Sequence, residues 1–126
     1  MPLSTYRVSA QIAVADLARA VEFYEGKLGL SPGANQHEGT RTYACGGGTL
    51  LHIYESPAHA GKATATVARW DVGDLERMVD ELSSRGVSFE RYGEPVKTNE
   101  KGIHDSGYGK VGWFRDPDGN TFALEQ

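Results

Sequence analysis

Apolar residues near the start of the chain follow first a two-residue period and then a helical one. Residues 7–14 alternate polar and apolar side chains, which is typical of a β-strand with one buried face. Asp16 occupies a position suited to a helix N-cap, apolar residues then recur at helical spacing, and Gly29 can end the helix. The pattern predicts a strand and a helix that pack together through their apolar sides.

The same succession returns in the second half of the chain. Residues 64–72 have strand character, Asp74 is the expected N-cap, and Gly86 follows a second helical stripe. The segment 14–17 (Val-Ala-Asp-Leu) matches the segment 72–75 (Val-Gly-Asp-Leu). This internal repeat predicts two similar modules.

Each module is expected to continue with strands. The predicted strands are residues 41–45, 50–55, 87–91, 111–115 and 121–125. Residues 30–36 are ambiguous because they contain Pro32 and Gly33, and residues 92–108 form a long polar loop. We therefore predict an α+β fold with two tandem βαβββ modules, residues 1–57 and 58–126. Together they would form a single domain, with one curved mixed sheet around a cleft and the helices outside.

The last two strands are joined by a strong turn signal. Asp116 can accept backbone N–H bonds, Pro117 presets the φ angle of the second position, and Gly119 can take a positive φ. Residues 116–119 are therefore expected to form a type I turn at the tip of a hairpin.

Composition excludes several functional classes. The 126 residues include 13 basic and 17 acidic ones, a formal net charge of −4, and the charges are interspersed. Neither nucleic acid nor a membrane is therefore an expected partner. No apolar run approaches the roughly 18 residues that span a bilayer, and the N-terminus lacks a signal-peptide core. The only cysteine, Cys45, cannot form an internal disulfide, so we expect a cytoplasmic protein.

Taken together, these motifs resemble the vicinal oxygen chelate superfamily, which includes glyoxalases, bleomycin resistance proteins and extradiol dioxygenases. The matching segments are 16–24 (Asp-Leu-Ala-Arg-Ala-Val-Glu-Phe-Tyr), 28–30 (Leu-Gly-Leu), 74–75 (Asp-Leu) and 114–120 (Phe-Arg-Asp-Pro-Asp-Gly-Asn). The resemblance covers nearly the whole chain. It leaves the activity open, because the fold includes isomerases, lyases, dioxygenases, thiol transferases and drug binders without catalysis.

The resemblance also implies where a metal would bind. The positions that correspond to the four metal ligands of metal-dependent members are Ser9, His52, Val67 and Ala123. Only His52 is a good ligand for a divalent ion, and a site needs about three protein ligands. A shift in strand register could add Glu125, which would make only two. No metal and no other cofactor is therefore expected, and a divalent metal is the alternative.

The strand periodicity separates a predicted ligand-binding wall from a predicted core. The candidate ligand-binding residues are Ser9, Gln11, His52, Tyr54, Arg69, Trp113 and Glu125. The residues assigned to the opposite faces are Val8, Ile12, Leu51, Ile53, Trp70, Val72, Phe122 and Leu124. A few polar groups among aromatic and small side chains are typical of small-molecule sites.

Each candidate has a structural alternative. His52 could act as a general base or hydrogen-bond donor, or be bonded to a neighbouring Tyr or Gln and only shape the cleft. Tyr54 and Trp113 could stack on a planar ligand or simply fill space. Arg69 could bind an anionic group or form an ion pair with Glu125 across the sheet.

The leading hypothesis is a metal-free protein that binds a small planar or aromatic molecule in the cleft between the modules. Antibiotic sequestration is the precedent that the resemblance supplies, and a homodimer is expected because dimers are common in this fold. Two alternatives are enzymes. One is a metal-dependent lyase, isomerase or dioxygenase, and the other is an acid/base enzyme that uses His52 with Tyr54. The last alternative is a scaffold whose cleft is filled by its own side chains.

Overall fold

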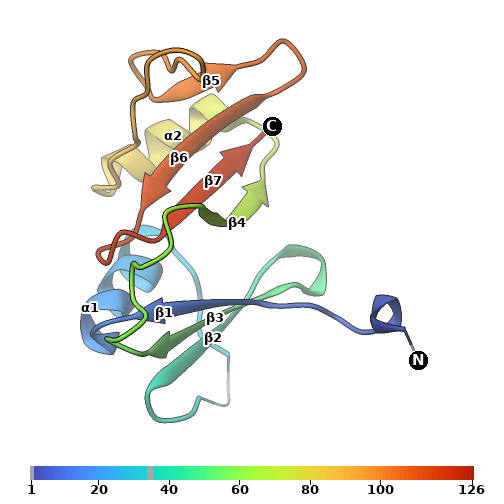
Figure 1. Ribbon diagram of the computed structural model, residues 1–126, viewed down its shortest axis with the longest axis vertical. Helices are drawn as coiled ribbons and strands as arrows, with labels where there is room; N and C mark the ends of the chain where they lie inside the picture. Colours follow the sequence, from blue (N-terminus) through green and yellow to red (C-terminus); the bar gives the residue numbers. More distant parts are fainter. Residues whose placement is uncertain (1, 34–35) are drawn as a thin grey trace. The chain divides into compact units, whose positions relative to one another are not determined.

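The computed structural model describes residues 2–33 and 36–126. The chain divides into two compact units, Met1–Gly61 and Lys62–Gln126, and each contains one sheet and one main helical segment (Figure 1). The two units are described separately below. The structure confirms the predicted α+β class with mixed sheets, and the predicted strands are distributed over a three-stranded and a four-stranded sheet.

The first unit is built around the parallel pairing of its first and last strands. Its elements are η1 (Leu3–Thr5), β1 (Ala10–Val14), α1 (Leu17–Val21), the π-helical η2 (Glu22–Lys27), β2 (Thr40–Ala44), η3 (Gly46–Gly48) and β3 (Leu50–Glu55). The strand order is β1-β3-β2, with β1 parallel and β2 antiparallel to β3. The central strand β3 therefore places one row of side chains beside both neighbours.

Two aromatic rings attach the helical segment to this sheet. Tyr24 and Tyr43 are fully buried and their rings stack with centroids 6.3 Å apart. The Tyr43 hydroxyl donates a hydrogen bond of 2.9 Å to Oε2 of Glu25. Burial of the phenol, together with this hydrogen bond, raises the pKa of Tyr43 above its ordinary value. Ile12 and Ile53 are buried on the same side, as the two-residue period predicts.

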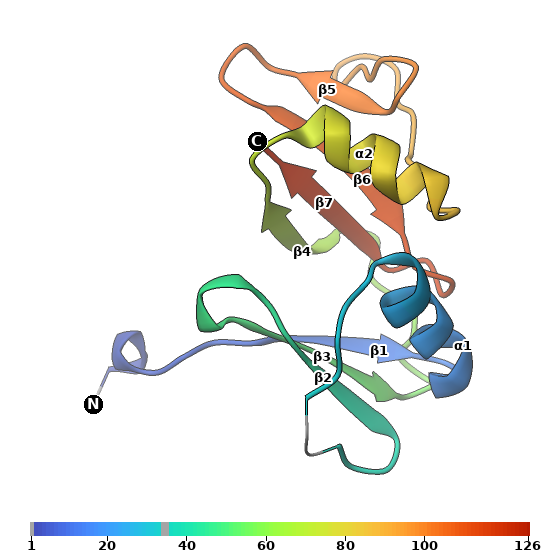
Figure 2. The ribbon, with the colours of Figure 1, turned by 180° about the vertical axis from the view of Figure 1, so that it is seen from behind.

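The second unit contains a sheet with more strands than the first, and a helix covers one of its faces. Its elements are β4 (Thr66–Asp71), α2 (Leu75–Ser84), β5 (Ile103–Asp105), β6 (Lys110–Arg115) and β7 (Thr121–Glu125). The strand order is β4-β7-β6-β5, and only β4 and β7 are parallel. Figure 2 shows α2 lying across the face formed by β6 and β7. Under it, Phe114 and Phe122 stack at 5.5 Å, and Trp70 lies 5.4 Å from Phe122.

The predicted helix boundaries are confirmed in both units. The carboxylates of Asp16 and Asp74 accept the backbone N–H groups of Arg19 and Arg77 at 3.3 and 3.2 Å. These side chains satisfy donors that have no partner within the first helical turn. At the other end, Gly29 and Gly86 adopt positive φ angles of 76° and 94°. The repeat therefore preserves both the start and the stop of each helix.

The turn between β6 and β7 is held by one buried carboxylate. Oδ1 of Asp116 accepts the backbone N–H groups of Asp118 and Asn120, each at 2.9 Å, and Oδ2 accepts Nδ2 of Asn120 at 2.8 Å. The Gly119 N–H donates to the Asp116 carbonyl at 3.0 Å, and the φ of Gly119 is 93°. The predicted turn is confirmed. Asn120 is, like Asp116, a buried polar residue, and its side chain takes part in the hydrogen bonds of the turn.

One predicted strand is wrong and one strand was missed. Residues 87–91 form no strand, and only Phe89 makes an isolated bridge to Phe114. Instead β5, which lies in the predicted loop, pairs with residues 110–112 of β6. The two segments share one edge of β6, because the Glu90 N–H donates to the Trp113 carbonyl at 2.8 Å. Because β6 has only six residues, it cannot pair fully with both segments along the same edge.

The start of the first strand also differs from the prediction. Regular pairing begins at Ala10, and Val8, which was assigned to the core, is 89% exposed. The alternation continues through residues 7–9, but no strand pairs with them. In the ambiguous segment 30–36, Pro32 forms an isolated bridge with Tyr43, while Ala34 and Asn35 lie outside the described residues. In the described part of the chain, the helices are too short or too polar to traverse a bilayer.

Replacing the turn carboxylate should weaken the second unit. Asp116→Ala leaves three donors without their acceptor, so we expect it to lower the free energy of unfolding by about 2–4 kcal/mol. Asp116→Asn keeps one carbonyl oxygen and should cost less than half as much. Urea denaturation of the two variants measures both effects. Equal stability of Asp116→Ala and the wild type would contradict this role.

Replacing Tyr43 should change how stability depends on alkaline pH. Its folded pKa is raised above the unfolded value of about 10, so its stabilising effect is present below that pH. The effect is lost as the pH rises through the folded pKa, because the unfolded chain then releases the proton more readily. Tyr43→Phe should cost about 1 kcal/mol near neutral pH through loss of the bond to Glu25. It should also reduce the loss of stability above about pH 10.

Tyr108→Phe is the matched control because Tyr108 is fully exposed. Denaturant titrations of both variants and the wild type across alkaline pH make the comparison. A Tyr43→Phe curve that runs parallel to the wild-type curve would exclude Tyr43 as the source of the dependence.

Candidate functional site

Strand register places three polar side chains in one row on the first sheet. Gln11 of β1 and Thr42 of β2 both lie opposite His52 of β3. The next row contains Ala13, Tyr54 and Thr40. Because side chains alternate along a strand, both rows lie on the face opposite the buried Ile12 and Tyr43. We call the surface formed by Gln11, Ala13, Thr40, Thr42, His52 and Tyr54 the first face.

His52 is fixed on the first face by Thr42. The Thr42 hydroxyl lies 2.7 Å from Nδ1 of His52, and both residues are half-buried. Within the described parts of the chain, the Nε2 atom of His52 and the side chains of Gln11 and Tyr54 have no hydrogen-bonding partner. The first face thus presents one oriented imidazole between two polar groups that remain available to a ligand.

The partner of His52 is a residue that sequence reasoning missed. One of the two interpretations of His52 gave it a tyrosine or glutamine partner, and the partner is a threonine on the adjacent antiparallel strand. The number of residues between Thr42 and His52 already indicated this contact. A short connection at Gly46–Gly48 joins β2 to β3, and counting outward from it places Thr42 opposite His52.

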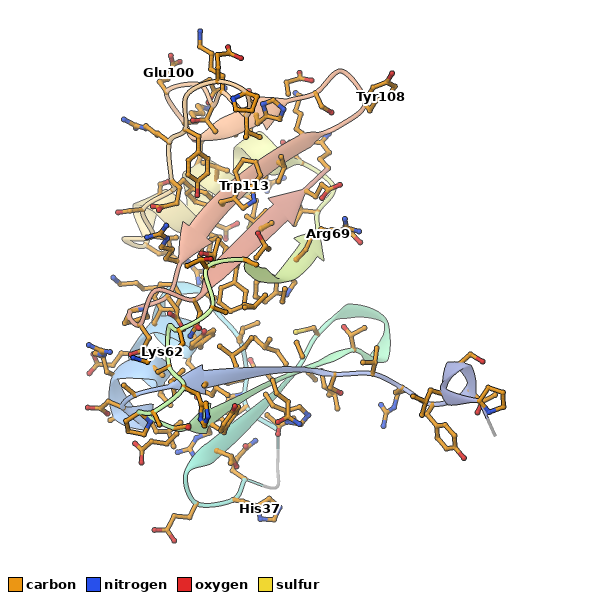
Figure 3. All side chains as sticks on the ribbon, viewed as in Figure 1. His37, Lys62, Arg69, Glu100, Tyr108 and Trp113 are labelled. Atoms are coloured by element: carbon orange, nitrogen blue, oxygen red, sulfur yellow. The ribbon has the colours of Figure 1, made fainter. Side chains whose placement is uncertain are left out.

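The second sheet has a corresponding hollow face. Arg69 of β4 and Trp113 of β6 both lie opposite Ala123 of β7. A cavity of about 400 Å³ covers this region. It is lined by Thr66, Arg69, Ser106, Tyr108, Gly109, Lys110, Val111, Trp113, Ala123, Glu125 and Gln126. We call this surface the second face. Figure 3 shows Trp113 on the sheet, Arg69 on β4 and Tyr108 at the tip of the β5–β6 connection.

Arg69 and Glu125 of the second face are already paired. Nη1 of Arg69 lies 3.1 Å from Oε2 of Glu125, and its Nε lies 3.2 Å from Oδ1 of Asp71. The expected alternative, an ion pair across the sheet, is therefore confirmed. The side chains of Arg69 and Glu125 are 53% and 43% exposed, so solvent screens the pair and its contribution to stability is small. An anionic ligand would have to compete with two carboxylates for this guanidinium.

Trp113 is held by a second aromatic residue that the sequence did not reveal. The ring of Tyr92 packs edge-on against it, with centroids 5.4 Å apart and an interplanar angle of 72°. Tyr92 belongs to the predicted polar loop, so no periodic pattern indicated the contact. The indole is thus supported on one side and borders the cavity with the rest of its surface.

In the long loop, His104 and the adjacent Asp105 bond to different partners. Nδ1 of His104 lies 2.9 Å from the carbonyl oxygen of Lys97, and the Asp105 carboxylate accepts the Gly107 N–H at 2.9 Å. His104 and Asp105 are consecutive residues of β5, so their side chains point to opposite faces. His104 therefore holds the loop that precedes β5, and Asp105 holds the β5–β6 connection.

The seven predicted ligand-binding residues fall into three groups. Gln11, His52 and Tyr54 lie together on the first face. Arg69, Trp113 and Glu125 lie together around the cavity of the second face. Ser9 precedes β1 and is half-buried without strand pairing. The structure therefore places three of them in each of two local sites, one in each unit.

The donor atoms do not fit a resident divalent ion at the four positions that the resemblance indicates. Val67 and Ala123 carry no lone pair and Ser9 offers a neutral hydroxyl, so His52, through Nε2, is the one good ligand among the four. Glu125 faces Arg69. Across residues 2–33 and 36–126, no cluster of three or more His, Cys, Asp or Glu side chains is arranged to hold a metal.

A larger hollow of about 610 Å³ lies beside α2 in the second unit. Its lining residues are Val79, Asp80, Ser83, Val87, Ser88, Phe89, Glu90, Arg91, Glu100 and Lys101. An ion pair of 3.2 Å between Lys101 and Asp80 lies at this surface. It has one aromatic side chain and none of the predicted ligand-binding residues. Its chemistry therefore supports binding less well than that of the smaller second face.

Comparison with known proteins agrees with the motifs. Residues 7–124 match the model of the Glyoxalase/Bleomycin resistance protein/Dioxygenase superfamily. A glyoxalase/bleomycin resistance protein from Catenulispora acidiphila is similar at 29% sequence identity, with a TM-score of 0.70 over 94% of this chain and 96% of that chain. A search among curated proteins gave no significant match.

Two further solved structures share the fold. The antibiotic-binding protein TnmS3 from a Streptomyces species is 22% identical, with a TM-score of 0.67 over 96% of each chain. A bleomycin resistance determinant encoded on transposon Tn5 is 21% identical, with a TM-score of 0.69 over 96% of this chain and 97% of that chain.

Proposed function

Because the chain belongs to the Glyoxalase/Bleomycin resistance protein/Dioxygenase superfamily, we propose that it binds a small planar or aromatic molecule on its open sheet faces without a metal ion. The observation that carries this proposal is the cavity of about 400 Å³ bordered by Trp113 and the Arg69–Glu125 pair. Its volume lies within the range of small-molecule sites, and an aromatic wall with few polar groups is typical of them.

The first face supports the same proposal with different chemistry. His52, Gln11 and Tyr54 supply oriented polar groups, whereas the second face supplies an indole and a guanidinium. On the first face, a planar ring can stack on Tyr54, and polar substituents can bond to Gln11 or His52. Such a combination gives affinity through apolar contact and orientation through hydrogen bonds.

Antibiotic sequestration is the biological role that we propose for this binding. Two proteins of the same fold are described as an antibiotic-binding protein and as a bleomycin resistance determinant. Neither role requires a reaction, and the proposed binding without a metal ion is compatible with both. Measurement of drug susceptibility in a host that expresses the chain, compared with a host that expresses a binding-deficient variant, tests this role.

A metal-free acid/base reaction at His52 is a second candidate function. The observation that favours it is the 2.7 Å contact between Thr42 and Nδ1, which orients the imidazole while Nε2 remains available. Incubation of a bound compound with the protein, followed by mass spectrometry, separates the two candidates. A bound compound recovered unchanged supports binding, and a converted compound supports catalysis.

A homodimer in the cytoplasm is the proposed state of the protein. Leu3, Tyr6 and Val8 are 85%, 64% and 89% exposed on the segment before β1, and they offer an apolar strip that a second copy can cover. The single cysteine suits a reducing compartment. Analytical ultracentrifugation measures the mass of the assembly, and a monomer at all concentrations would contradict the proposal.

His52→Ala should weaken ligand binding while the fold is retained. A thermal-shift screen of small planar compounds, with and without divalent metals, identifies a ligand because binding to the folded state raises the melting temperature. For that ligand we expect His52→Ala to raise Kd about three- to tenfold, the loss of one hydrogen bond. His37→Ala is the control because His37 is exposed outside both faces.

Two results would oppose the assignment. Loss of folding in His52→Ala with unchanged affinity per folded molecule would give His52 a structural role. An equal loss of affinity in His37→Ala would show that the effect is not specific to the first face.

A further inference from the structure

The first face contains a hydrogen bond whose direction can be worked out from its surroundings. Thr42 Oγ1 and His52 Nδ1 are 2.7 Å apart, and either atom could carry the shared proton. A hydroxyl has one proton to donate and a neutral imidazole has one N–H. The direction of this bond therefore decides whether Nε2, which has no partner among residues 2–33 and 36–126, donates or accepts.

The backbone of Thr42 is held firmly on both sides. Its N–H donates to Oε1 of Gln36 at 2.8 Å, and its carbonyl accepts Nε2 of Gln36 at 3.2 Å. The same carbonyl accepts the Gly33 N–H at 3.0 Å. The Gln36 amide thus takes the place of a neighbouring strand at this point. With its backbone bonds fully used, Thr42 offers His52 only its hydroxyl.

Hydrogen-bond accounting favours one direction. If Thr42 donates to Nδ1, its proton and the ring lone pair are both satisfied. If His52 donates instead, the Thr42 hydroxyl proton has no protein acceptor in the described parts of the chain, because its only contact is with His52. The first arrangement leaves only the Nε2–H of His52 without a partner, whereas the second leaves both the Thr42 hydroxyl proton and the Nε2 lone pair unpaired, and each unpaired group is costly.

We propose that Thr42 holds His52 in the tautomer protonated at Nε2, so that the first face presents a hydrogen-bond donor and selects planar ligands that carry a carbonyl or other oxygen acceptor. Gln11, directly opposite His52, adds the two N–H donors of its amide. No carboxylate occupies the two rows of this face. The proposal rests on the proposed binding function and assigns the ligand class to the first face, with Thr42 as the positioning residue.

The tautomer can be measured without any ligand. In protein labelled with ¹⁵N-histidine, long-range proton–nitrogen correlation spectra above the pKa of histidine distinguish a proton on Nε2 from one on Nδ1. We expect the Nε2–H form for His52 in the wild type, a loss of this preference in Thr42→Val, and its restoration in Thr42→Ser. An Nδ1–H form in the wild type, or the same tautomer in all three proteins, would overturn the proposal.

Ligand selection is tested with a matched pair of flat molecules. Fluorenone carries one carbonyl oxygen, and fluorene has the same ring system without it. We expect the wild type and Thr42→Ser to bind fluorenone about three- to tenfold more tightly than fluorene, with His52 resonances shifting during the titration. Thr42→Val should bind both compounds with similar affinity.

The possible outcomes separate this proposal from the general binding function. If both compounds bind the wild type equally, the planar-ligand function stands and the donor assignment is wrong. If neither compound binds, the ligand selection proposed here and the planar-ligand function on the first face are both wrong. If fluorenone is preferred but Thr42→Val retains the preference, Thr42 is not the positioning residue.

Discussion

The pairing of β3 with both of its neighbours is the constraint on which the first unit depends. β3 lies between β1 and β2, and a fixed register aligns His52 with Gln11 and with Thr42. A shift of one residue would exchange the two faces of a strand, placing Ile53 where His52 lies. The buried Ile12, Ile53 and Tyr43 prevent such a shift, because each would move toward solvent. Burial of the core therefore sets the geometry of the polar face.

In the second unit, packing of the core also determines which side chains lie on the open face of the sheet. Trp70, Phe114 and Phe122 pack in an aromatic cluster under α2, which leaves Arg69, Trp113 and Ala123 on the other face. Ala123 is small, so the neighbouring Trp113 and Arg69 border a cavity rather than a filled layer. The turn at Asp116 supports this arrangement by fixing where β6 ends and β7 begins.

Local signals in the sequence were sufficient for much of the fold. The two Asp caps, the glycines that end the helices and the turn at Asp116 depend on neighbouring residues, and all were predictable. The identity of the strand on the free edge of β6 was not. That choice is a competition between residues 87–91 and 103–105, and it is decided by non-local pairing. Periodicity favoured residues 87–91 and assigned residues 103–105 to a polar loop, so it selected the wrong segment.

The residues of the candidate site were also predictable only in part. Alternation along each strand identified His52, Tyr54 and Trp113 as residues of the open faces, but not the side chains that hold them. Thr42 and Tyr92 lie on other segments, and their contacts depend on register and on the path of a loop. Family membership establishes the fold but does not identify the activity, because one fold supports many activities. The chemistry depends on these residues.

The central claim is that the polar groups of this chain are arranged to bond to a small molecule and not to coordinate an ion. His52 offers only its Nε2 atom, Glu125 is paired with Arg69, and Val67 and Ala123 offer no donor. Elemental analysis of protein purified without chelators tests this claim most directly. The account predicts zinc, nickel, manganese and iron far below one equivalent per chain. A stoichiometric amount of any of them, retained through dialysis and lost in His52→Ala, would contradict it.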